Sequence, residues 1–180
     1  LIQMLALLLS LASPPAHATT VVALDVSDQA VESHAFVEAT VGKQQTFRTG
    51  TEWYTLTELR VVDLVAGSAP ETVWIRQIGG EHDGRVLYLP GDARFETGQR
   101  VAGFIREVQG QWYVTALGQS VWHLEGEGPS ARVHRDVEGM HFMERAPEGG
   151  VVPATQSLPD FSTYGELRKA VSTLDFGGDL

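Results

Sequence analysis

Histidine and acidic residues lie close together in one stretch of the sequence, in the pattern that comes closest to a metal site. His134 and Asp136 are at positions i and i+2, so their side chains would share one face if this stretch is a strand. Zinc takes three or four nitrogen and oxygen ligands that converge on one point, and His141 is near enough in sequence to join them. A metal-dependent hydrolase using His134, Asp136 and His141 is therefore one hypothesis. No H-E-x-x-H spacing supports it, and exposed polar residues on an acidic protein are the simpler interpretation.

Other catalytic patterns are weaker still. Ser120 lacks the G-x-S-x-G elbow and an oriented base, without which a hydroxyl is a poor nucleophile. The glycine pairs at 79–80 and 149–150 do not belong to a phosphate-binding loop motif, and we interpret them as turns. The sequence contains no cysteine, which excludes thiol catalysis and cysteine-ligated zinc. These patterns predict no cofactor and favour a function other than catalysis.

Aromatic residues in strand-like segments suggest a binding face. Aromatic platforms on small barrels bind oligosaccharides or single-stranded nucleic acid. Arg76 is expected to point outward, opposite to Val73 and Ile75, and its guanidinium is suited to a carboxylate of a partner. The residues predicted for a ligand or partner face are Trp74, Arg76, Gln77, Tyr88, Trp112 and Trp122. About half of such aromatic residues are expected to be core instead, because neighbours in a strand point to opposite faces.

The segments that would position these residues are short strands between glycine and proline turns. The expected strands are 35–41, 52–65, 72–78, 85–89, 101–105, 111–116 and 121–124. Apolar alternation slips inside 52–65, which predicts a β-bulge or a strand bent across two sheets. Gly42-Lys43 is expected to end the first strand, and His82-Asp83-Gly84 to form a turn. Six or seven such strands predict a mainly-β fold, a small OB-like barrel or sandwich.

Two short helices are expected to flank the strands. Residues 24–34 form the first, capped by Asp25 or Ser27, with Ala30, Val31 and His34 facing inward. The second begins at Thr163, where Thr163 and Glu166 have the spacing of a capping box. Its apolar stripe consists of Leu167, Ala170, Val171 and Leu174.

The first 18 residues have the pattern of a secretory signal peptide. A short apolar run is followed by Pro14-Pro15 and an A-x-A site, which predicts cleavage after Ala18; a retained anchor is the alternative. We then expect a β-barrel domain at 19–125, a linker with an irregular or hairpin segment at 126–160, and a C-terminal helix and tail at 161–180. No transmembrane segment is expected in the mature chain, which would be secreted or periplasmic.

The net charge of the chain limits the classes of ligand that it is expected to bind. The 180 residues carry 13 Lys and Arg against 23 Asp and Glu, a formal net charge of −10. Nucleic-acid binding needs clustered basic residues, and the sequence has no basic run. A glycan or a protein therefore remains as the expected ligand.

The strand block resembles a family of uncharacterised exported bacterial proteins. The family pattern includes VTVRQ-GG, F-x-x-GE-x-V-L-F-L and GL-x-QG, and the corresponding segments here are VWIRQIGG at 73–80, FETGQRVAGFI at 95–105 and VTALGQS at 114–120. Ala66, Gln99, Gly103 and Ser120 depart from that pattern. The resemblance implies a small OB-like barrel with flanking helices and no established activity. It also implies an association with co-secreted zinc proteases, since some members are encoded beside them.

Together these patterns predict an exported, non-enzymatic binding or accessory module of the bacterial envelope or secretome. Its partner would be a co-secreted protein such as a protease, or a glycan. The metal-dependent hydrolase and a structural surface protein are the alternatives.

Overall fold

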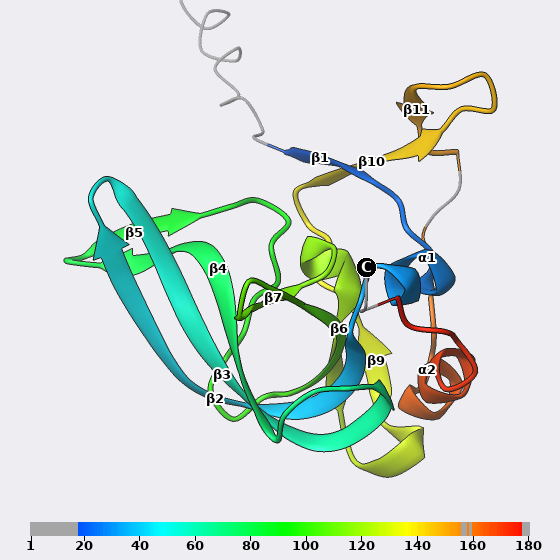
Figure 1. Ribbon diagram of the computed structural model, residues 1–180, viewed down its shortest axis with the longest axis horizontal. Helices are drawn as coiled ribbons and strands as arrows, with labels where there is room; N and C mark the ends of the chain where they lie inside the picture. Colours follow the sequence, from blue (N-terminus) through cyan, green and yellow to red (C-terminus); the bar gives the residue numbers. More distant parts are fainter. Residues whose placement is uncertain (1–17, 156–157, 159, 178–180) are drawn as a thin grey trace, which may run out of the picture.

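A computed structural model describes residues 18–155, 158 and 160–177. The predicted signal peptide lies outside the described residues, apart from Ala18. The chain is mainly β, as predicted, with two short α-helices and two 3₁₀ turns among the described residues (Figure 1). No helix in this part of the chain is long and apolar enough to cross a membrane.

Five strands pair in a closed circuit. They are β2 (Ala35–Thr49), β3 (Glu52–Gly67), β4 (Thr72–His82), β6 (Arg100–Val108) and β7 (Gln111–Val114). The order is β2-β3-β4-β7-β6, and β6 returns to pair with β2. All of these pairings are antiparallel except β4–β7, which is parallel at Ile75 and Trp112. Strand β8 (Val121–Glu125) extends the sheet from β6, and β9 (Arg132–His134) extends it from β8.

Strand β2 closes the circuit because it is long and bent. Its first half pairs with β6 on one side, while its whole length pairs with β3 on the other. Register shifts interrupt the β2–β3 pairing after Phe36, Glu38 and Val41, so the predicted bulge is present. The expected strand end at Gly42-Lys43 is wrong, since the strand continues past this shift to Thr49.

The β2–β3 hairpin and the β4–β5 hairpin project beyond the circuit as an arm (Figure 1). Strand β5 (Arg85–Tyr88) pairs only with β4. The two residues between them, Asp83 and Gly84, both have positive φ, at 50° and 69°. This is the geometry of a two-residue hairpin turn, which confirms the predicted turn.

Two clusters of buried residues form the core. The first fills the inside of the circuit and includes Val41, Leu59, Ile75, Val101 and Ile105. The second lies where the other face of β2, β6 and β8 packs against the helices, and aromatic residues dominate it: Phe36, Phe104, Trp122 and Tyr164.

The two helices form where they are predicted, with one correction to the residues that face inward. In α1 (Val26–Val31) the Asp25 carboxylate accepts hydrogen bonds from the backbone N–H groups of Ser27 and Asp28, as predicted. Val31, however, is 55% exposed, and Gln29 is buried beside Ala30 instead. Helix α2 (Tyr164–Val171) begins with the predicted capping box of Thr163 and Glu166.

A second sheet joins the two ends of the β region. Its strands are β1 (Thr19–Val22), β10 (Met140–Arg145) and β11 (Val151–Pro153), in the order β1-β10-β11. Within 126–160, where an irregular or hairpin segment is expected, β10 and β11 pair antiparallel, while β9 belongs to the larger sheet. The 3₁₀ turns are η1 (Leu117–Ser120) and η2 (Gly128–Ser130).

Candidate functional site

The inward-facing residues of the circuit change from apolar to polar toward the arm. On β4, Val73 and Ile75 are buried in the first core cluster, and the next residue on that face is Gln77. On β3, Leu59 is followed on the same face by Thr57 and Thr55. Buried polar side chains are costly unless they have partners, so this change marks the edge of the core and the beginning of a pocket.

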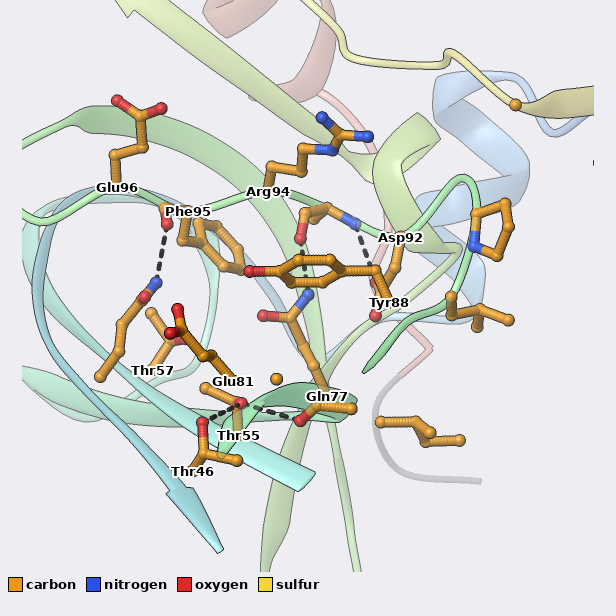
Figure 2. A pocket seen from close by; sticks show the side chains of 18 of the residues that line it. Thr46, Thr55, Thr57, Gln77, Glu81, Tyr88, Asp92, Arg94, Phe95 and Glu96 are labelled. Atoms are coloured by element: carbon orange, nitrogen blue, oxygen red, sulfur yellow. Dashed lines mark hydrogen bonds between the residues drawn. The ribbon is translucent and has the colours of Figure 1, made fainter. Parts of the chain in front are cut away.

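A loop that runs from Leu89 to Glu96 forms the opposite wall of the pocket. The Gln77 Nε2 group donates a 2.6 Å hydrogen bond to the carbonyl oxygen of Ala93, and Gln44 Nε2 donates one of 2.8 Å to that of Phe95 (Figure 2). These bonds fix the loop against β4 and β2. The pocket is open on one side and has a volume of about 700 Å³, within the usual range of small-molecule sites.

Gly79 and Gly80 shape the floor of the pocket. Both have positive φ, at 94° and 129°. A β-carbon added to Gly80 would lie 2.1 Å from Thr55 Oγ1 and 2.6 Å from Thr46 Oγ1, so the space beside these hydroxyls requires glycine. The expectation that Gly79 and Gly80 form a turn is wrong, because both lie within β4 and pair with β5. Thr55 Oγ1 donates a 2.9 Å hydrogen bond to the carbonyl oxygen of Gly79, which ties β3 to this part of β4.

Tyr88 lies at the mouth of the pocket. It comes from the end of β5, opposite Gly79, and it remains 66% exposed. Figure 2 shows its ring across the opening, between Phe95 and the side chains of Gln77 and Asp92. An exposed aromatic ring above polar groups is a common feature of ligand sites.

Thr57 is a buried residue of the pocket lining. It is 0% exposed, and its Oγ1 atom makes no hydrogen bond with any residue that the structure describes. A buried hydroxyl is normally satisfied by protein or by an ordered molecule. Thr57 therefore has a free donor and free acceptor positions inside the pocket.

Acidic side chains outnumber basic ones around the pocket. Among the described lining residues Glu81, Asp92, Glu96 and Glu138 are acidic and Arg94 is basic. Arg94 also faces Asp136, with 3.5 Å between Nε and Oδ2. Burial raises the pKa of Asp92 above its ordinary value, and hydrogen bonds from Gln77 and the Ala93 N–H oppose this rise. The site is thus suited to neutral or cationic ligands.

The predicted ligand face is divided among three places. Gln77 and Tyr88 belong to the pocket. Trp74 and Arg76 lie on the outer face of β4, as expected for Arg76, where its guanidinium is 4.1 Å from the ring centroid of Tyr54 and Lys43 Nζ is 5.2 Å from that of Trp74. Alternate residues of β4 therefore point into the pocket and to the outer face.

The remaining two aromatic residues of the predicted face are packing residues. Trp122 is 0% exposed in the second core cluster, so the expectation that it contacts a ligand is wrong. Trp112 is half-buried against the first core cluster, and its ring meets that of His34 edge-on at 5.9 Å.

The predicted metal ligands do not converge. His134 lies on β9, where its ring is 5.2 Å from that of His123, while His141 lies exposed on β10 of the other sheet. Asp136 faces Arg94. In the part of the chain that the structure describes, no three His, Asp or Glu side chains are arranged to hold a metal ion. The metal triad proposed from sequence spacing is therefore wrong.

Most residues of the pocket could not be predicted from the sequence. Threonine and glutamine on the inner face carry no motif, and the loop at 89–96 has no regular structure. One signal was present: Thr57 and Gln77 occur where the alternation set by Leu59 and by Val73 and Ile75 calls for an apolar residue.

Comparison with family models, with curated proteins and with solved structures gives no match for this chain.

Proposed function

We propose that this protein is a non-catalytic binding module whose ligand occupies the pocket between the inner face of β2, β3 and β4 and the loop at 89–96. The observation that carries this proposal is the buried, unpartnered hydroxyl of Thr57 inside a preformed pocket. A fold that leaves such a group unsatisfied loses stability, and a ligand that bonds to it restores the loss.

Binding is favoured over catalysis by the types of residue present. The described residues that line the pocket include no histidine, serine or lysine, so carboxylates are the main candidates there for a nucleophile or base. Besides these carboxylates, the pocket presents amide and hydroxyl groups, which recognise ligands by hydrogen bonding.

We further propose that the five-stranded circuit is OB-like. Support comes from the strand order β2-β3-β4-β7-β6 with return to β2, the parallel β4–β7 pair, and the long bent β2. OB folds bind oligosaccharides and oligonucleotides at the face of their second and third strands. Those strands would be β3 and β4 here, and both line the pocket.

We also propose, from the sequence, that the protein is exported. The signal-peptide pattern supports export, so the ligand is expected among envelope or secreted material. Both classes named by the sequence, a glycan and a co-secreted protein, are accessible there.

Fractionated ligand capture tests the binding function. The immobilised full chain is exposed separately to the polysaccharide and protein fractions of envelope and culture medium from its source. Wild-type protein is expected to retain material that the pocket variant Gln77→Leu does not, while Gln45→Leu, an exposed glutamine on β2, retains it. Equal retention by all three proteins, or none by wild type, would overturn the proposal.

A further inference from the structure

The hydrogen-bonding groups of the pocket are unevenly divided between donors and acceptors. Thr55 gives its single hydroxyl proton to the carbonyl oxygen of Gly79. The 3.0 Å contact between Thr46 Oγ1 and Thr55 Oγ1 must therefore be donated by Thr46. Both threonines thus have no proton left and can only accept.

The two glutamines add to this imbalance. Gln77 uses one amide N–H on the carbonyl oxygen of Ala93, and Gln44 uses one on the carbonyl oxygen of Phe95. Their amide oxygens stay available as acceptors. A matching ligand must therefore bring several donors.

The rim restricts the charge of that ligand. Glu81, Glu96 and Glu138 surround the opening, and Arg94 is shared with Asp136. A carboxylate, sulfate or phosphate on the ligand would meet like charge without a dedicated cation, which disfavours anions. Hydroxyl and amino groups meet no such repulsion.

The exposed ring of Tyr88 restricts the shape of the ligand. It offers a flat apolar face above a layer of polar groups (Figure 2). A ligand that fits both needs an apolar side for the ring and donors around its edge. A pyranose ring combines these, since its C–H groups gather on one face and its hydroxyl groups lie around its rim.

We propose that the pocket binds a pyranose sugar without an acidic group, neutral or amino-substituted, with one face on Tyr88 and a hydroxyl bonded to Thr57 Oγ1. This inference rests on the proposed binding function and names its ligand class. Thr57 distinguishes the site from an acidic surface patch, because its 0% exposed hydroxyl needs a partner that reaches inside.

Protein-observed NMR titration of the full chain tests the inference with methyl glucoside, glucosamine and methyl glucuronide. The first two are expected to bind with a measurable Kd, and the glucuronide at least about tenfold more weakly, the equivalent of about one lost hydrogen bond or one repulsive contact. Thr57→Val and Tyr88→Ala should each weaken binding by about tenfold or more. Trp74→Ala, on the outer face, is the control and should leave Kd unchanged.

The outcomes separate this inference from the binding function. Binding of the glucuronide as tightly as the glucoside, or insensitivity to Thr57→Val, would overturn the sugar assignment. If none of the three sugars binds while Gln77 still controls capture from the protein fraction, the sugar assignment fails and the binding function stands. If none of the sugars binds and Gln77→Leu does not change capture, both the sugar assignment and the binding function fail.

Discussion

Gln77 Nε2 and the carbonyl oxygen of Ala93, 2.6 Å apart, join strand β4 to the loop that faces it across the pocket. The side chain of Gln77 continues the inner face on which Val73 and Ile75 are buried. The same residue thus ends the core and holds the far wall of the pocket in place. The pocket exists because polar residues replace apolar ones at this end of the circuit.

The variant Gln77→Leu is expected to lose both the loop position and ligand binding. It leaves the Ala93 carbonyl, in a residue that is 6% exposed, without its partner. An unsatisfied buried acceptor costs about 1–3 kcal/mol, which urea denaturation measures. The control Gln45→Leu should change the free energy of unfolding by no more than about 0.5 kcal/mol, as exposed substitutions usually do. Equal effects of the two variants would show that the hydrogen bond does not hold the loop.

Thr57→Val should stabilise the ligand-free protein while it weakens binding. The hydroxyl of Thr57 is buried without a partner, so its replacement by a methyl group removes a desolvation penalty of about 1 kcal/mol. Thr115→Val is the matched control. Thr115 is also buried, but its Oγ1 is 2.6 Å from Ser33 Oγ, so its loss should destabilise by about 1 kcal/mol. Destabilisation by Thr57→Val would mean that the hydroxyl has a partner in the free protein.

Two of the three tryptophans of the predicted face, Trp122 and Trp74, should differ in how much their replacement destabilises the protein. Trp122 packs against Phe36, Phe104 and Phe161, and its truncation to alanine should cost about 3–5 kcal/mol. Trp74→Ala, on the outer face, should cost about 1 kcal/mol, near the centre of the range for single substitutions. Thermal or urea unfolding followed by circular dichroism measures both. A similar cost for the two would contradict their assignment to core and outer face.

Acidification should destabilise the protein through His123. Burial lowers the pKa of His123 below its ordinary value of 6.5, and His134 beside it lowers the pKa further. The unfolded chain therefore takes up this proton first, so stability is full above about pH 6.5 and falls as pH drops from there toward the folded-state pKa. His123→Gln should reduce this slope between pH 6.5 and 5, whereas His141→Gln, at an exposed position, should keep it. An unchanged slope in His123→Gln would assign the pH dependence to other groups.

The strands were largely predictable because each is a local pattern. All seven expected strands are present, and six of them end within about five residues of their expected ends, whereas β1, β9, β10 and β11 were not predicted. The exception is β2, where the register shift after Val41 lets the strand continue beyond a glycine that looked like a terminator. The caps at Asp25 and Thr163 were also visible, because capping depends on residues a few positions apart.

The site was less predictable because long-range pairing decides which face a residue occupies. Trp122 and Trp74 look equivalent in sequence, but one lies under α2 and the other on an open face. His134 and His141 are close in the chain yet belong to different sheets. The pairing of β3 with β2 and with β4 places Gln44, Thr57 and Gln77 on one face, and the closure of β2 on β6 makes that face the interior.

A crystal structure of the full chain grown or soaked with glucosamine tests the central claim most directly. We expect the sugar ring against Tyr88, with one hydroxyl within hydrogen-bond distance of Thr57 Oγ1 and others at the acceptors of Thr46 or Gln44. A sugar bound elsewhere on the protein, or a pocket without sugar at saturating concentration, would contradict the account.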